Sequence, residues 1–156
     1  MGTSSKKTAY SDRTDLEKIF SNWNKIRGLL KRGEWSSAIV RAATATEIAA
    51  NLVIREELVD GYGLPKPLVD HFLLWANGIR GKFEKLILPV TNGKTHNAEL
   101  IKLKKRVDDI NKERNSIVHT GAFKSEAKAH QIVNEARSVI LALVAIYYDG
   151  FELDKP

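Results

Sequence analysis

The sequence predicts an all-α fold, in the form of a compact up-and-down bundle of four to five helices. Apolar residues recur along most of the chain at the spacing of an amphipathic helix, and no sustained strand-like alternation appears. The 156 residues, 43% hydrophobic and 28% charged, suit one soluble domain with its own core. We place this single helical domain at residues 12–150, between a flexible N-terminal arm at 1–11 and a C-terminal tail at 151–156.

Capping and stop signals bound the first two helices. The first is expected from about Asp12 to Lys31, and the spacing of Thr14 and Glu17 is that of a capping box. The second is expected from Trp35 to about Val59, because Asp60-Gly61-Tyr62-Gly63 is a strong stop signal.

Proline and glycine signals bound the rest of the chain. A third helix is expected to begin near Pro65 to Pro67 and to continue to Leu88. A polar loop with an Asn-Gly turn follows at 89–97, and a fourth helix spans about Ala98 to Val118. A fifth begins after Ser125, a typical N-cap residue, and ends at Asp149-Gly150, which leaves an extended tail.

Several function classes are excluded or disfavoured by composition. The chain has no cysteine, which excludes disulfides, thiolate metal sites and cysteine nucleophiles. The longest uninterrupted apolar run, 139–148, is shorter than the roughly 20 residues that span a bilayer, and the polar N-terminus has no secretory signal. We therefore expect a cytoplasmic protein with no membrane partner. The histidines lack metal-ligand spacing, so we expect no metal and no cofactor: His71, His96, His119 and His130.

The net charge of +6 favours an acidic partner, of which nucleic acid is the commonest. Gly61-Tyr62-Gly63 lacks the Gly-Lys-Ser/Thr ending of a phosphate loop and is interpreted as a turn. The three tryptophans have helical spacing among apolar residues, so we predict core packing over base stacking for Trp23, Trp35 and Trp75.

The most informative residue is an arginine on an apolar face of the fourth helix. At about 100° per residue, Arg114 falls in the middle of a stripe formed by Leu100, Leu103, Val107, Ile110, Ile117 and Val118. A guanidinium facing a bundle core is costly unless it is paired. We therefore expect Arg114 to meet a carboxylate, a phosphate or a wet cleft. The commoner role for such an arginine is a structural ion pair.

Polar residues that suit phosphate chemistry surround this arginine. His119 lies about 140° around an ideal helix from Arg114, but the following Gly121 predicts that the helix ends or unwinds near His119. Asn115 precedes His119 by four residues and could orient its imidazole. Basic residues on the same flank could follow an RNA backbone: Lys104, Lys105 and Lys112. A histidine near a helix C-terminus more often serves as a cap, and lysines on a helix face more often serve solvation.

Arg114-Asn115-Ser116-Ile117-Val118-His119 resembles the signature of the HEPN superfamily, the higher eukaryotes and prokaryotes nucleotide-binding domain. That signature is an arginine, a polar residue and then a histidine after four to six intervening positions. The alanine-rich segment 33–47, with its internal Glu47, is similar to a helix that many HEPN proteins carry. The fold that the resemblance implies is a HEPN-like bundle.

Glu47 shares its helical strip with Ala43, Ala50 and Ile54, so a cationic partner is expected. Arg114 is the candidate, in which case Glu47 supports the site by holding the guanidinium. The alternative, at even odds, is a surface pair with Arg41 or Arg55.

The resemblance implies a metal-independent endoribonuclease with a composite site at a homodimer interface. The ribose 2′-OH would attack the adjacent phosphate, His119 would be the acid or base, Arg114 would stabilise the transition state, and Asn115 would orient one of them. The implied setting is prokaryotic defence, stress response or a toxin–antitoxin pair, with an antitoxin or a nucleotidyltransferase as cognate partner. The alternatives are a non-catalytic HEPN module that binds nucleotide, RNA or a protein, and a generic helical interaction domain.

Overall fold

The computed structural model describes Tyr10 and residues 13–156, and all regular secondary structure within this part is helical. The flexible arm expected at 1–11 lies, apart from Tyr10, outside the described residues. In chain order the helices are α1 (Asp15–Lys31), α2 (Trp35–Arg55), the π-helical η2 (Glu56–Gly61), α3 (Lys66–Trp75), α4 (Gly78–Lys82), the π-helical η3 (Phe83–Ile87), α5 (Leu88–Thr91), α6 (Asn97–Thr120) and α7 (Glu126–Ala145).

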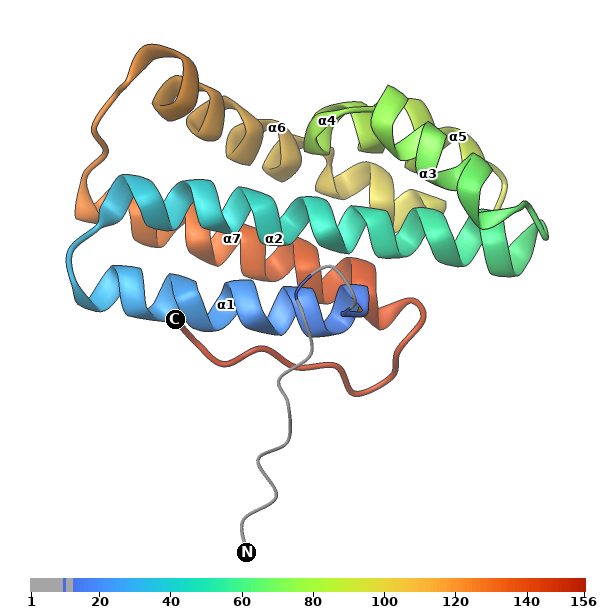
Figure 1. Ribbon diagram of the computed structural model, residues 1–156, viewed down its shortest axis with the longest axis horizontal. Coiled ribbons are helices and arrows are strands. Elements are labelled where there is room, and N and C mark those ends of the chain that lie inside the picture. The colour runs from blue at the N-terminus through green and yellow to red at the C-terminus, as the bar shows by residue number, and fades with distance from the viewer. Residues whose placement is uncertain (1–9, 11–12) are drawn as a thin grey trace, which may run out of the picture.

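The long helix α2 lies at the centre of the bundle. It packs against α1, α7, α6 and α4 (Figure 1). Its alanines allow this close approach, because Ala38, Ala42, Ala45, Ala49 and Ala50 are fully buried. The segment Trp35–Gly61 is also the one described helix long and apolar enough to cross a membrane, a property that core helices of soluble proteins share.

The first and last predicted helices form as their capping signals indicate. Thr14 accepts a hydrogen bond from the backbone N–H of Glu17 while the Glu17 side chain accepts one from the Thr14 backbone, so the capping box is present. Ser125 caps α7 by accepting from the Lys128 N–H. However, α7 ends at Ala145, four residues before the predicted Asp149.

The region 65–88, predicted as one helix, is broken. α3 ends at Trp75, and Gly78, at φ +77°, begins the short α4 after a bend. Helix continues through η3 into α5, so residues 89–91 of the predicted polar loop are helical. These short helices gather over one end of α2, beside the first half of α6 (Figure 1).

Two predictions about burial are wrong. Trp23 is buried and Trp35 packs against the core, but Trp75 is 62% exposed because the bend after α3 turns it outward. On α6, Leu100, Val107 and Ile110 are buried, whereas Val118 is 48% exposed. The apolar stripe of α6 therefore stops one turn before the helix does.

The C-terminal tail has no regular secondary structure, as predicted, but it packs along α1 (Figure 1). Leu153 is buried, and its carbonyl accepts hydrogen bonds from the guanidinium of Arg137. The indole N–H of Trp23 donates to the Asp154 carbonyl at 2.9 Å. The tail therefore forms part of the core.

Candidate functional site

Arg114 lies half-buried on α6 and borders a pocket of about 410 Å³ between α2, the α4–η3 segment and α6. We call this the Arg114 pocket. Its polar lining includes Glu47 from α2, Arg80 and Glu84 from the α4–η3 segment, and Asn111, Arg114 and Asn115 from α6. Asn111 is a neighbour of both Arg114 and Asn115 on the surface of α6, because it precedes them by three and four residues.

The Arg114 guanidinium donates one hydrogen bond, from Nη1 to Oδ1 of Asn115 at 3.1 Å. Among the described residues no carboxylate lies within ion-pair distance of it. Of the three partners expected for this cation, the structure provides a wet cleft. A guanidinium in this setting retains donors for a ligand with oxygen acceptors.

The predicted ion pair between Glu47 and Arg114 is absent. Glu47 instead accepts a hydrogen bond from Nζ of Lys82 at 2.8 Å, and Lys82 also donates to the carbonyl of Leu73 at 3.2 Å. The bend after α3 is the reason, because it turns the Lys82 side chain inward until only 5% remains exposed. Glu47 still lines the wall of the Arg114 pocket.

The surface pairing of Glu47 with Arg41 or Arg55 is also absent. Arg41 donates to the amide oxygen of the buried Asn22 at 3.2 Å. Arg55 forms an ion pair with Asp15 at 2.7 Å and a longer one with Asp70 at 3.6 Å. Glu47 is thus a partner of Lys82 alone among the described cations.

His119 does not border the Arg114 pocket. The helix ends close to His119, as Gly121 predicts, but it does not unwind there, because α6 stays helical through Thr120 and is followed by Gly121, whose φ of +66° is left-handed. The Gly121 N–H closes the helix on the carbonyls of Ser116 and Ile117. His119 is therefore exposed on the last turn, about 140° around the helix from Arg114. The expected hydrogen bond from Asn115 to His119 is not formed among the described contacts, since the Asn115 carbonyl accepts from Arg114.

The three predicted RNA-binding lysines do not share one surface. Lys104 approaches the pocket rim, with Nζ 3.7 Å from Glu84. Lys105 forms an exposed pair with Asp109 at 3.1 Å, and Lys112 is exposed with no ion pair in the described part of the chain. The distribution fits α6 geometry, in which Lys105 and Lys112 are seven residues apart and Lys104 lies a quarter turn away.

Arg80 contacts two acidic residues at the rim of the Arg114 pocket. Its Nε lies 3.1 Å from Glu84 and 3.7 Å from Asp108 of α6. The hydrogen bond from Arg80, followed by its charge and that of Lys104, outweighs partial burial and lowers the pKa of Glu84. Glu84 is therefore an anion that orders the rim cations at neutral pH.

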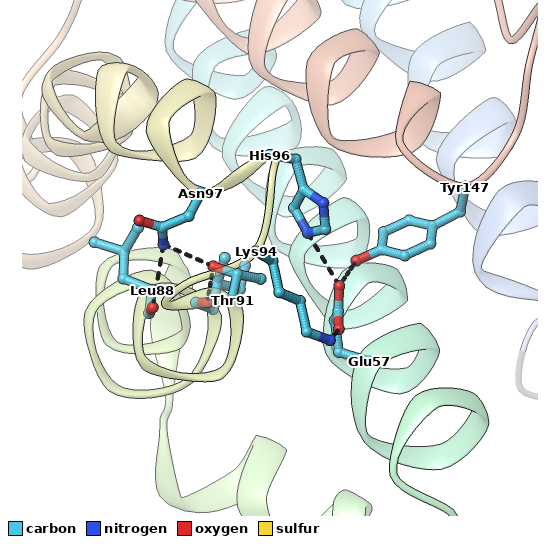
Figure 2. A network of polar contacts seen from close by, with 8 residues as sticks. Glu57, Leu88, Thr91, Lys94, His96, Asn97 and Tyr147 are labelled. Atoms are coloured by element: carbon cyan, nitrogen blue, oxygen red, sulfur yellow. Dashed lines mark hydrogen bonds and ion pairs between the residues drawn. The ribbon is translucent and has the colours of Figure 1, made fainter.

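A polar cluster that the sequence analysis missed lies at the far end of α2 (Figure 2). The buried Glu57 carboxylate in η2 binds Nζ of Lys94, Nε2 of His96 at 3.1 Å and the Tyr147 hydroxyl. We call these four residues the Glu57 cluster. Glu57 continues the buried strip of α2, four residues after Val53. Glu57 could therefore have been identified by the same criterion as Glu47, which is a carboxylate on an otherwise apolar strip of a helix.

Burial alone would raise the pKa of Glu57, but the hydrogen bonds from Lys94 and Tyr147, with the charges of Lys94 and His96, lower it below its ordinary value. Burial and the hydrogen bond to Glu57 raise the pKa of Tyr147. The cluster joins η2, the 92–96 turn and the end of α7, so its evident role is to hold these segments together (Figure 2).

A larger pocket, about 890 Å³, lies elsewhere, between α1, the end of α2 and α3. Three of the charged residues that line it are paired with each other, Arg55 with Asp15 and with Asp70. Tyr148 likewise donates to Glu56 at 2.8 Å. We assign the candidate site to the smaller Arg114 pocket because its half-buried cation is a guanidinium with no carboxylate partner in the described structure, and a planar guanidinium matches the oxygens of a phosphate.

No group of three or more metal-ligating side chains gathers anywhere in the part of the chain that the structure describes. No protein-family model, curated protein or solved structure matches the chain. The resemblance to HEPN proteins therefore depends on the Arg114–His119 segment, on the alanine-rich α2 and on the helical architecture alone.

Proposed function

We propose that this chain is a cytoplasmic, metal-independent endoribonuclease of the HEPN type. One observation carries the proposal: the half-buried Arg114 guanidinium borders a polar pocket and has no carboxylate partner among the described residues. A cation that folding has partly desolvated and left without an anion is suited to an anionic ligand. The net charge of +6 adds a general attraction for nucleic acid.

The chemistry that fits these residues is attack of a ribose 2′-OH on the adjacent phosphate. The 2′-oxygen forms a bond to phosphorus as an imidazole accepts its proton, and the bond from phosphorus to the 5′-oxygen breaks as that oxygen receives a proton. The products are a 2′,3′-cyclic phosphate and a 5′-OH end. The planar guanidinium of Arg114 stabilises the negative phosphorane oxygens, and Asn115 holds the guanidinium in position.

Because the reaction uses two proton transfers, we propose a composite cleft formed by two copies of the chain. His119 lies outside its own Arg114 pocket, at the exposed end of α6. A two-fold axis near this end brings both histidines to one cleft and supplies an acid and a base.

Exposed apolar side chains surround His119 and support an interface at this end. Val118 is 48% and Phe123 is 96% exposed. The loop that carries Phe123 is held in place, since Lys124 forms an ion pair with Glu113 at 2.8 Å and its N–H donates to Ser36 at 2.9 Å. A large aromatic side chain fixed in solvent is typical of a surface that a partner covers.

The test is cleavage of single-stranded RNA by the purified protein in excess EDTA. We expect Arg114→Ala to lower the rate about 10²- to 10³-fold and His119→Ala about 10²- to 10⁴-fold. Arg32→Ala and His130→Ala remove the same side chains elsewhere and should cut at the parent rate. Cleavage by both site variants at the parent rate would refute the assignment.

A second function, nucleotide or RNA binding without cleavage, is favoured by the position of His119 outside the pocket. The amides of Asn77, Asn111 and Asn115 in the lining can donate to and accept from a base edge. Binding that Arg114→Ala abolishes, with no cleavage by the parent, would establish this alternative. A toxin–antitoxin or defence role, with an antitoxin or nucleotidyltransferase partner, belongs to the catalytic proposal and is tested by growth arrest on expression.

A further inference from the structure

Most of the Trp75 side chain is exposed to solvent and is not packed in the core. It ends α3, and 62% of it is accessible. Neither of the other tryptophans is exposed in this way, since Trp23 is buried and Trp35 packs against the core. No aromatic ring in the described part of the chain stacks against Trp75.

A lysine accompanies this indole. Nζ of Lys85, in η3, lies 4.9 Å from the centroid of the Trp75 ring. Lys85 forms no ion pair within the described structure, unlike Arg80 and Lys104 nearby. A cation over an indole face is attractive and holds the ring in a defined orientation. The pair therefore offers an ordered aromatic surface with an unpaired positive charge beside it.

Neither residue of this pair lines the Arg114 pocket, but both are close in the chain to residues that do. Trp75 precedes Asn77 by two residues and Lys85 follows Glu84 directly, and Asn77 and Glu84 both line that pocket. Two residues of chain span at most about 7 Å. Lys104, 3.7 Å from Glu84, extends the positive rim on the α6 side.

We propose that Trp75 and Lys85 form a stacking subsite for one base of a single-stranded RNA, with Lys85 contacting the neighbouring phosphate. Aromatic rings beside cations are the usual means of holding unpaired bases, and stacking tolerates any base. The unpaired charge of Lys85 favours a polyanion over a protein segment as the occupant. The assignment of the Arg114 pocket to the next phosphate along the strand rests on the proposed function.

The test uses the His119→Ala protein, which we expect to bind RNA without cutting it, and a fluorescently labelled single-stranded RNA. We expect Trp75→Ala to weaken RNA binding about tenfold and Trp75→Phe to weaken it less, because a smaller ring still stacks. Leu74→Ala is the matched control, since Leu74 is 76% exposed on the same helix and should leave affinity unchanged. Binding should also quench the tryptophan fluorescence of the parent, and Trp75→Phe should remove that quenching.

An affinity unchanged by Trp75→Ala, with the variant folded by circular dichroism, would overturn the subsite and leave Trp75 as a protein-docking surface. The cleavage assay is independent of this result. If Arg114→Ala abolishes cleavage while Trp75→Ala binds RNA normally, only the subsite fails. If Trp75→Ala weakens binding and the parent does not cleave, the subsite stands and the catalytic proposal fails.

Discussion

At the residue scale, three charged side chains lie at positions where the helical pattern is otherwise apolar, and they differ in whether an opposite charge neutralises them. Glu47 and Glu57, ten residues apart on the α2 axis, each meet a lysine, Lys82 and Lys94 respectively. Arg114 meets only the amide of Asn115. Because the carboxylates are paired within the fold and the guanidinium is not, their removal should have opposite consequences for stability and for activity.

We predict that Glu47→Gln lowers the free energy of unfolding by about 1–3 kcal/mol, because it replaces the carboxylate that neutralises the buried Lys82 ammonium with an uncharged amide. Arg114→Ala should change that free energy by less than about 0.5 kcal/mol. Urea unfolding of both variants measures the difference. An Arg114→Ala variant as unstable as Glu47→Gln would show that Arg114 is a structural residue.

The sequence identified Arg114 and Glu47 as charged residues that require a polar or oppositely charged partner, but it did not identify those partners. Arg114 and Glu47 stand out because burial of a charge is costly wherever the chain places it. Their partners depend on tertiary geometry, and Lys82 gave no signal, since a lysine in a helix normally points to solvent. The pairing of Glu47 with Arg114 was therefore the wrong choice among several cations on other helices.

At the element scale, the bend after α3 determines the layout around the site. It turns Lys82 toward Glu47 and Trp75 toward solvent, and it places Arg80 at the pocket rim. Helical periodicity predicted the type of almost every element but not this break, since a helical wheel assumes one axis across the whole segment. Periodicity also did not predict the π-helical segments η2 and η3, which contain Glu57 and Lys85.

We predict that the Glu57 cluster makes the stability of the bundle sensitive to acid. The pKa of Glu57 is lowered in the folded protein, so its contribution is complete above the unfolded value, near about 4.3, and is lost as pH falls through the folded pKa. The groups facing it are Lys94, His96 and Tyr147. Glu57→Gln should therefore be less stable than the parent at pH 7 and lose less stability on acidification.

Chemical denaturation from pH 7 down to about pH 3 measures this dependence. Glu56→Gln is the control, since Glu56 is the adjacent residue and contacts the exposed Tyr148 instead of the cluster. A parent and a Glu57→Gln variant with parallel pH profiles would contradict the role given to the cluster.

At the scale of the whole molecule, the described structure separates the two parts of the motif. Arg114 borders a pocket between helices, and His119 lies with Val118 and Phe123 at the exposed end of α6. The sequence predicted the angle of about 140° between the two residues on an ideal helix, but it could not decide whether α6 stays helical at His119, as it does. We therefore propose that assembly of two chains brings both groups to one phosphate.

We predict that mixtures of parent and His119→Ala chains, allowed to exchange subunits, lose activity with the square of the parent fraction. An equal mixture should retain about a quarter of the parent activity, because only a dimer with two histidines supplies both proton transfers. The control is an equal mixture of parent chains with the double variant Phe123→Asp/His119→Ala. This variant should not join the interface, so the mixture should retain about half of the parent activity. A linear loss in the first mixture would mean that each chain acts alone.

The central claim is that Arg114 and His119 act on an RNA phosphate through the adjacent 2′-OH. Its most direct test is an oligodeoxynucleotide set with one ribonucleotide at a fixed position, all four bases included, incubated with the protein in EDTA. The account predicts cleavage only on the 3′ side of the ribonucleotide, with a 2′,3′-cyclic phosphate, and none by Arg114→Ala or His119→Ala. Cleavage of the all-deoxy strand, or cleavage of the chimaeras by both variants at the parent rate, would contradict it.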